Sequence, residues 1–454
     1  MKSFRKVFAS TALVVVGSMS VATMASAESI SGSGATFPQN FQAAATVEYT
    51  KSSGNTVTYA NPGGGSSKGK TDFFGNLVDF AGSDSAVSST QAGSTAFSWV
   101  YVPYVAGAIA VAYRLDALTG ATLNLSIPTV AGIFGGTIKT WNDPAIVADM
   151  KANAIWANST KKSAYKGASA LWTPTSTTAA TLTVTLTPAA LKAAKGKKIE
   201  ILEDKKSVKT VTVAAKGQIS IDVTTTEATY TVKVDGKEVA KYALVTPTLP
   251  ATPITVVYRS DGSGTTNNFI KPLNANSSTW TVNDTFTTAI PGGSTAVAGF
   301  GAAFQGQSGS TNVSNYIAAT NGSIGYTEIS FVTDATRAAA GMKAANIKNA
   351  AGKYVAPTAS AVSSMIADSD IDSKGFVTFN FKQTTNTTAY PVVAVTYGLG
   401  RVEKTSKNIV VSDYLSWILN TYAPAAAESL GFAPLTGTLL AIAKNKAKSV
   451  GSGN

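Results

Sequence analysis

Hydrophobic and polar residues alternate with two different periodicities along this chain. Near its start, Phe41 and Ala45 lie one helical turn apart, which predicts a helix over 38–49, and residues 56–59 alternate like a strand. Further elements of this kind are a helix at 71–76 and strands at 77–81, 105–113 and 254–258. Helices that alternate with strands favour an open, mostly parallel α/β sheet with ligands at the strand ends.

Between about residues 159 and 250 the periodicity changes, and threonine, valine and lysine repeat with a period of two. This pattern predicts short strands, and Asp235-Gly236 between two of them predicts a hairpin turn. A series of such strands is typical of a small immunoglobulin-like β-sandwich, inserted here into the α/β body. The strands are expected at 181–186, 198–202, 208–213, 219–223, 230–234 and 237–244.

The first 27 residues have the features of a signal peptide. Basic residues at positions 2, 5 and 6 precede an apolar run, and Ala25-Ser26-Ala27 matches the A-x-A cleavage pattern. We therefore expect an exported, soluble mature chain that begins at Glu28, in the periplasm or otherwise outside the cell. No later uninterrupted apolar stretch approaches the roughly 18 residues that span a bilayer.

The 454 residues include no cysteine and no histidine. This excludes a disulfide, a lipid-bearing cysteine, a structural zinc site, a Cys-His pair and a Ser-His-Asp triad, and with them most hydrolase classes. No cofactor is expected. The formal charge of +12 is local, because 14 lysines stand against 7 acidic residues between Lys161 and Lys241. Such a segment is either a solvated surface or a contact for an anionic wall polymer or membrane, and nucleic acid is not an expected partner.

The chemistry is concentrated in residues 259–266, which read Arg-Ser-Asp-Gly-Ser-Gly-Thr-Thr. The guanidinium of Arg259 offers a rigid fork of donors to a tetrahedral oxyanion, and glycine lets the backbone approach closely. A hydroxyl residue at a helix start adds donors beside the free N–H groups there, and residues 267–270 can begin such a helix. The segment therefore indicates an anion clamp.

Residues 64–71 satisfy the nucleotide-binding P-loop pattern G-x-x-x-x-G-K-T and follow a strand. An NTPase is therefore a formal competitor. Export to a compartment poor in ATP counts against it, as does the lack of a convincing apolar strand that ends in a magnesium-binding aspartate. Either interpretation lets the amides of this loop cradle phosphate oxygens.

Four segments together resemble the periplasmic phosphate-binding proteins of bacterial ABC phosphate importers. They are 32–38 (Gly-Ser-Gly-Ala-Thr-Phe-Pro), 78–84 (Val-Asp-Phe-Ala-Gly-Ser-Asp), 259–266 and 322–326 (Gly-Ser-Ile-Gly-Tyr). The resemblance covers nearly all of the mature chain except the β insert, and it implies a two-lobed, type II-like periplasmic binding protein fold. Lys68, where a small residue is common, and the insert itself depart from the family pattern.

The resemblance also implies which residues bind phosphate. From one lobe, donors would come from Thr36, Phe37 and Ser66. From the other, the far side would be closed by Ser263, Gly264 and Thr265. Arg259 would be the charged clamp, held in place by Asp261, and Asp84 would be the one acceptor.

An acceptor suits phosphate because phosphate keeps one or two protons near neutral pH, whereas sulfate has none to donate. A buried acceptor that faces a lone pair stays unpaired, so Asp84 alone could reject sulfate. Ordinary explanations stay open for each residue: an N-cap for Asp84, a surface salt bridge to Asp261 for Arg259, and capping and packing for Thr36, Phe37 and Ser66. Tyr326 is expected to pack in the core or hinge.

The sequence thus predicts a solute-binding protein that captures inorganic phosphate between two lobes and delivers it to the permease subunits of an ABC importer. One lobe would combine 28–106 with 390–454, the other 107–160 with 250–389, and the insert would be 161–249. We expect a monomer that is not an enzyme. Two alternatives stay open: an adhesion or scaffold protein that acts through the insert, and a phosphatase-like enzyme that uses the same pocket.

Overall fold

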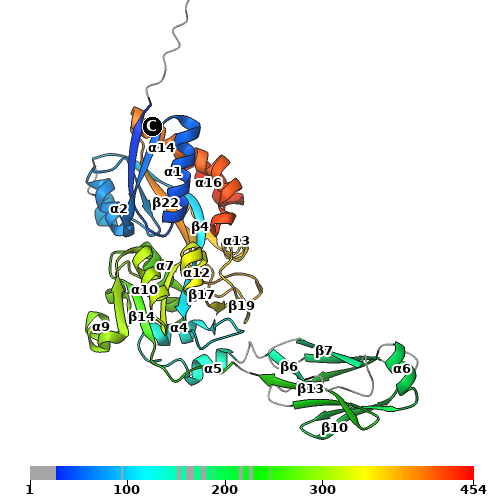
Figure 1. Cartoon of the computed structure of the whole chain (residues 1–454). Helices are drawn as coiled ribbons and strands as arrows, with labels where there is room; N and C mark the ends of the chain where they lie inside the picture. Colours follow the sequence, from blue (N-terminus) through cyan, green and yellow to red (C-terminus); the bar gives the residue numbers. More distant parts are fainter. Residues whose placement is uncertain are drawn as a thin grey trace, which may run out of the picture.

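A computed structural model describes residues 27–93, 96–150, 155–159, 168–174, 180–186, 188–213, 218–223, 229–245 and 247–453 (Figure 1). The expected signal peptide lies outside these residues, apart from its last position. Within the described ranges, no helix combines the length and the apolar character that crossing a membrane requires.

Two lobes are built on one central sheet, whose strands run in the order β15-β14-β16-β4-β22-β3-β1-β2, with β17 and β23 also paired to β4. Its strands are β1 Ser29–Gly34, β2 Thr56–Gly64, β3 Phe80–Ser83, β4 Trp99–Arg114, β14 Thr255–Arg259, β15 Phe304–Gln307, β16 Ser323–Glu328, β17 Met342–Ala344, β22 Val393–Arg401 and β23 Phe432–Ala433. The outer strands pair in parallel, whereas β4 and β22 pair antiparallel with each other and with their neighbours. The expectation of a mostly parallel sheet is therefore wrong, because the two central strands run in opposite directions.

Strand β4 belongs to both lobes. Its residues from Trp99 to Ala108 pair with β22, and those from Ile109 to Arg114 pair with β16. The strand is buried from Tyr101 to Tyr113, as a near-continuous apolar run covered on both faces should be. It starts at Trp99, earlier than the expected 105–113, because Tyr101, Pro103 and Tyr104 are buried along with the apolar residues. The lobe boundary at 106/107 lies beside the change of partner and stays our proposal.

Helices surround the sheet in both lobes (Figure 1). The first lobe holds β1–β3 with α1 Gln39–Ser53, α2 Gly65–Phe74, α14 Ser406–Trp417 and α16 Gly437–Ser449. The second lobe holds β14–β16 with α4 Ile127–Phe134, α7 Gly264–Asn276, α9 Gly293–Phe300 and α10 Gly309–Ala319. The other helices are α3 Ser89–Gly93, α5 Pro144–Met150, α8 Phe286–Ala289, α11 Ile329–Thr333, α12 Ala335–Ala339, α13 Ala359–Ala367 and α15 Ala423–Ala426, with 3-10 turns at Gly301–Ala303 and Glu428–Leu430 and a π-helical segment at Ile418–Tyr422.

The first lobe follows the sequence pattern with one correction. Helix α1 buries Phe41, Ala45 and Tyr49 at every fourth residue, which confirms the helix expected there. The helix expected at 71–76 begins earlier, at Gly65, and the strand expected at 77–81 begins only at Phe80. Asn76 turns the chain with φ 58°, which leaves Leu77 72% exposed instead of in the sheet.

The insert forms antiparallel sheets that share no strand with the central sheet, in the orders β10-β9-β12-β13-β6 and β11-β8-β7. Its elements are β6 Ile155–Ser159, β7 Ala168–Pro174, β8 Ala180–Leu186, α6 Pro188–Ala194, β9 Lys198–Glu203, β10 Lys206–Thr212, β11 Gln218–Val223, β12 Thr229–Val234 and β13 Lys237–Val245. Every expected strand is present, and Asp235 and Gly236 have the positive φ angles (53° and 74°) of the expected hairpin turn. Helix α6 and strands β6 and β7 were not expected. Because β6 pairs with β13, the insert that we propose takes in β6 as well.

Two small sheets complete the fold. One consists of β5 Asn124–Leu125, β18 Asn346–Lys348 and β19 Tyr354–Val355, and the other of β20 Asp370–Ile371 and β21 Val377–Thr378.

Candidate functional site

The N-termini of three helices, α2, α7 and α10, meet between the lobes. A Cβ atom on Gly264, the first residue of α7, would lie 2.5 Å from Ser66 Oγ in α2 and 2.8 Å from Asp84 Cβ, so only glycine allows this approach. At the start of α10, the amide of Ser310 donates to Thr36 Oγ1 over 3.2 Å. Helix N-termini carry partial positive charge and free N–H groups, so their convergence favours an anion. We call this set of residues the interlobe cluster: Thr36, Ser66, Asp84, Arg259, Asp261, Ser263, Gly264, Thr265 and Ser310.

Arg259 ends β14 inside the cluster and is 1% exposed. Its Nε donates to Asp261 Oδ1 over 2.6 Å, and its Nη2 is paired with the other carboxylate oxygen of Asp261. Its Nη1 lies 3.4 Å from Ser310 Oγ, and its backbone amide donates to the Tyr326 hydroxyl. Because the pair is buried, the interpretation of Arg259 as a surface salt bridge is wrong.

Asp261 is held in its charged form. Burial alone would raise its pKa, but the hydrogen bonds and the charge of Arg259 keep the pKa of Asp261 below its usual value. The amide of Gly309 also donates to Asp261 Oδ1 over 3.0 Å, so this carboxylate links Arg259 to the start of α10. The guanidinium is therefore fixed in one orientation before any ligand arrives.

Asp84 follows β3 and is 3% exposed. Thr396 Oγ1 donates to its Oδ1 over 2.8 Å, and Ser66 Oγ lies 3.4 Å from its Oδ2. Burial raises the pKa of Asp84 from about 3.8 to about 7, against the opposing effects of the Thr396 hydroxyl, the Arg259 charge and the Ser66 hydroxyl. The carboxyl can therefore gain or lose a proton near neutral pH. The N-cap interpretation is wrong, because the next helix, α3, begins only at Ser89.

The start of α7 holds donors without partners. Thr265 Oγ1 is buried and, among the described residues, has no hydrogen-bond partner. Ser263 Oγ accepts from the Thr266 amide over 3.1 Å and so caps the helix. The amides of Gly264 and Thr265 open the helix and have no acceptor one turn earlier. A buried polar group without a partner is costly, which indicates that a ligand completes this site.

Thr36 and Phe37 differ in the polar groups that they can present to a ligand. Thr36 Oγ1 lies 3.1 Å from Ser310 Oγ and faces the cluster. The Phe37 side chain is fully buried and packs edge-on against Phe432, with ring centroids 5.9 Å apart. Its ring therefore belongs to the core, and only its backbone is available to a ligand.

The P-loop interpretation is wrong, because residues 65–74 form helix α2 where a nucleotide-binding protein would have an open loop. Lys70 Nζ pairs with Asp284 Oδ2 over 2.9 Å. Lys68, the departure from the family pattern, is 56% exposed and pairs with Asp72 on its own helix, so its charge lies outside the interlobe cluster.

Sequence reasoning missed Ser310, Thr396 and Asp284. Ser310 had a readable signal, because Ser308-Gly309-Ser310 leads from β15 into α10 like the other small-residue turns of the cluster. Thr396 sits inside the buried strand β22 and has no such signal. Tyr326 is in the core as expected, stacked on Phe269, and its hydroxyl also contacts Arg259.

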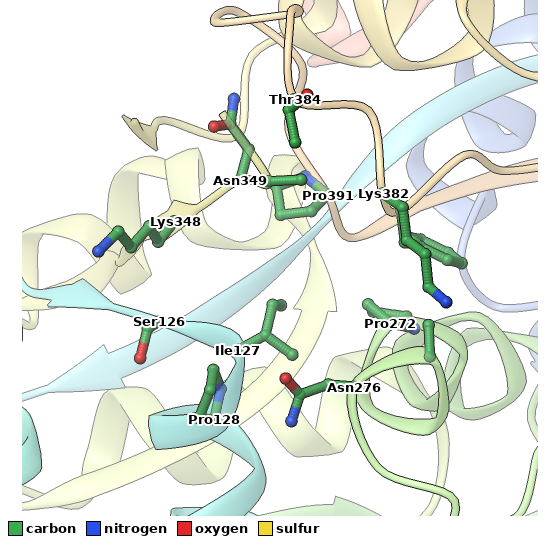
Figure 2. Close-up of a pocket in the computed structure, with 13 residues that line it drawn as sticks. Ser126, Ile127, Pro128, Pro272, Asn276, Lys348, Asn349, Lys382, Thr384 and Pro391 are labelled. Carbon is green, nitrogen blue, oxygen red and sulfur yellow. The ribbon is translucent and has the colours of Figure 1, made fainter. Parts of the chain in front are cut away.

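Two hollows of the molecule differ in how they relate to this cluster. A groove of about 400 Å³ between α4 and α7 is lined by Ile127, Pro128 and Pro272, with Lys348 and Lys382 at its sides (Figure 2). None of the residues in the interlobe cluster lines it. A smaller pocket of about 260 Å³ reaches the cluster at Asp84. Within the described residues, no group of three or more Asp or Glu side chains could hold a metal ion.

Comparison with known proteins places the chain among binding proteins. A family model described as the PBP superfamily domain matches residues 20–248 and 237–421. The phosphate-binding protein PstS 3 of Mycobacterium leprae is 42% identical over 102 residues, which is 21% of this chain and 26% of that protein. PstS of Haemophilus influenzae is 37% identical over 124 residues, which is 27% of this chain and 36% of that protein. The chain thus spans only about a quarter to a third of the length of these curated relatives.

Two solved structures share the fold at low identity. The periplasmic phosphate-binding protein PfluDING, solved with phosphate at pH 8.5, aligns with a TM-score of 0.56 at 21% identity, over 92% of this chain and 93% of that one. A phosphate-binding protein from Stenotrophomonas maltophilia aligns with a TM-score of 0.51 at 17% identity, over 92% and 93% of the two chains. Both alignments support the two-lobed architecture.

Proposed function

The chain belongs to the PBP superfamily, and from this premise we propose that it binds inorganic phosphate in the interlobe cluster and delivers it to the permease of an ABC importer. The observation that carries the proposal is the meeting of Arg259 and Asp84 at three helix N-termini. Phosphate-binding proteins among the relatives support it. No comparison supports the adhesion interpretation.

Residues of the cluster, together with the backbone of Phe37, supply either donors or the one acceptor for phosphate in this proposal. Arg259, oriented by Asp261, donates to two oxygens of phosphate, and the start of α7 adds the Thr265 hydroxyl and free amides. Thr36, Phe37, Ser66, Ser263 and Gly264 supply further hydroxyl or amide donors. Asp84 accepts the proton that phosphate still carries, and it leaves sulfate with an unpaired contact. Binding closes the lobes, and no bond is made or broken.

Titration calorimetry with phosphate and sulfate tests the proposal. We expect wild type to bind phosphate and not sulfate. Asp84→Asn should lose about 1–3 kcal/mol of phosphate binding, because the acceptor is weakened, and gain some sulfate binding, because its amide can donate. Asp116→Asn, an exposed carboxylate paired with Arg114, is the matched control and should behave as wild type. Equal binding of both anions by wild type, or no phosphate binding, would refute the proposal.

We further propose that the protein is a carrier and not a phosphatase, and that it works as a monomer. The cluster offers no histidine or cysteine nucleophile, since the chain has neither residue. A chromogenic phosphate ester incubated with the protein should stay intact, and steady release of the dye would contradict this. Sedimentation of the protein with phosphate should give one species of monomer mass.

Export and the role of the insert are proposals of the same kind. We propose that residues 1–27 are a signal peptide, and mass spectrometry of the exported chain should then find Glu28 at its start. We also propose that the lysines of the insert contact an anionic surface polymer. Residues 204–210, which include Lys205, Lys206 and Lys209, are exposed along the edge strand β10, as such a contact requires.

A further inference from the structure

A second set of polar contacts crosses between the lobes beside the cluster. Asp284, in the segment between α7 and α8, accepts three hydrogen bonds from the first lobe at its Oδ2. The donors are Ser67 Oγ at 3.0 Å, Lys70 Nζ at 2.9 Å and Ser85 Oγ at 2.9 Å. Its Oδ1 accepts from Asn267 Nδ2 of its own lobe over 3.0 Å.

The ion pair at the centre of these contacts is largely shielded from water. The side chains of Lys70 and Asp284 are 6% and 16% exposed. The ammonium of Lys70 is also held by Ser85 Oγ at 3.0 Å and the Ala86 carbonyl at 3.1 Å, both in the first lobe. All of its donors therefore point at defined acceptors, and one of them belongs to the other lobe.

These contacts sit one residue away from the proposed phosphate ligands. Ser67 follows Ser66, and Ser85 follows Asp84. On the second lobe, the carbonyl of Asp284 accepts from the amide of Ser263 over 2.9 Å. The pair thus joins the backbone segments that carry ligands on both sides. Other bonds between the lobes, such as Thr36 with Ser310 and Asn40 with Ser330, join neutral side chains.

We propose that Lys70 and Asp284 form an interlobe latch that sets phosphate affinity by holding the lobes closed around the ligand. This rests on the proposed function, and it makes both residues positioning residues that do not touch phosphate. When the lobes part, each charge returns to water, so the attraction acts only in the closed form. Removing one partner leaves the other charge buried and unpaired in that form alone, and the closed fraction falls.

Four variants test the latch by calorimetry and stopped-flow binding of inorganic phosphate: Lys70→Met, Asp284→Asn, their double variant and the control Lys68→Met. Lys68 lies in the same helix but pairs with Asp72 inside the first lobe. We expect each latch variant to raise the Kd about tenfold, chiefly by faster release, while the control stays within about twofold. The double variant should raise the Kd by a smaller factor than the product of the two single-variant factors. Kd values within twofold of wild type would overturn the latch.

A second measurement reports closure itself. The chain has no cysteine, so Leu77→Cys in the turn that follows α2 and Thr295→Cys in α9 give one pair of exposed positions for fluorescent labels, one in each lobe. Without phosphate, Lys70→Met should show lower energy transfer than wild type, and saturating phosphate should restore it. A raised Kd with unchanged transfer would overturn the latch, since Lys70 would then act in another way.

This readout also separates the latch from the proposed function. If wild type failed to bind phosphate, the proposed function would fall, and the phosphate-free transfer would still decide the latch. Lower transfer in both Lys70→Met and Asp284→Asn would support it, and unchanged transfer would reject it. Thermal melting of every variant by circular dichroism identifies loss of fold.

Discussion

At the scale of single residues, the site depends on one carboxyl whose surroundings change its chemistry. Asp84 is buried beside Thr396 and Ser66, and burial raises its pKa to about 7. Arg259 and Asp261 form the opposite case, a fully paired couple with a fixed geometry. Asp84 can exchange a proton near neutral pH, whereas the lowered pKa of Asp261 favours its charged form, so selectivity and charge attraction are assigned to different residues.

The raised pKa of Asp84 predicts a pH dependence of stability. Because the pKa is about 7 in the folded protein and near 3.8 when unfolded, the folded form binds more protons between about pH 4 and 7. Stability therefore falls as pH rises through this window, by roughly 4 kcal/mol at most. Urea unfolding of wild type and Asp84→Asn without phosphate measures this. We expect the variant to gain stability relative to wild type on going from pH 5 to pH 8, and a constant difference would contradict the assignment.

At the scale of elements, the site is made by helix starts that approach each other closely. Gly264 begins α7 against Ser66 and Asp84. The cap at Ser263 fixes where the helix starts, and so fixes where its free amides point. The functional unit is thus the turn from strand to helix, used at α2, α7 and α10.

Adding one methyl group at Gly264 should weaken phosphate binding. We expect Gly264→Ala to cost the closed form about 1–3 kcal/mol, because its Cβ would overlap Ser66 Oγ and Asp84. Calorimetry would then show a higher Kd for phosphate. The matched control is Gly299→Ala in α9, whose Cβ would meet nothing within 4 Å. Gly299→Ala should keep wild-type affinity for phosphate. Equal affinities of Gly264→Ala and Gly299→Ala would show that binding does not require the close approach at Gly264.

At the scale of the whole molecule, the two lobes share β4, and the described strands of the insert stand apart from the central sheet. The segments of the second lobe that precede and follow the insert lie side by side. The amide of Trp141 donates to the Thr252 carbonyl over 3.1 Å, and that of Ile254 to the Lys139 carbonyl over 2.9 Å. The second lobe therefore closes the gap by itself, without the insert.

Removing the insert should leave phosphate binding intact. We expect a variant with residues 151–249 replaced by a short Gly-Ser linker to bind phosphate within about a factor of two of wild type, because the described strands of the insert pair only with one another and none joins the central sheet that carries the cluster. Calorimetry and a melting curve measure this, and lost binding with an intact melt would contradict it. The same variant should no longer be retained by anionic wall polymer. Unchanged retention would remove the polymer contact from the insert.

The sequence by itself determined the local features of this protein. Residues 259–266 indicated an anion clamp, Asp235-Gly236 indicated the hairpin between β12 and β13, and the spacing of Phe41 and Ala45 indicated α1, because turns, caps and periodicity depend on residues close together in the chain. The sequence misleads at the start of α2, because glycine and serine at 64–67 and glycine at 69 indicate a loop, whereas the structure begins the helix at Gly65.

Only the tertiary structure decided which of these features face each other. Thr396 reaches Asp84 across 312 positions, and Thr36 meets Ser310 across 274. Lys70 lay in a nucleotide-binding pattern, yet its partner Asp284 is 214 positions away. Such pairings follow from the order and direction of strands in the sheet, which no local pattern encodes. Strand β4, which pairs antiparallel with β22 in the first lobe and with β16 in the second, is the element that joins the two halves of the site.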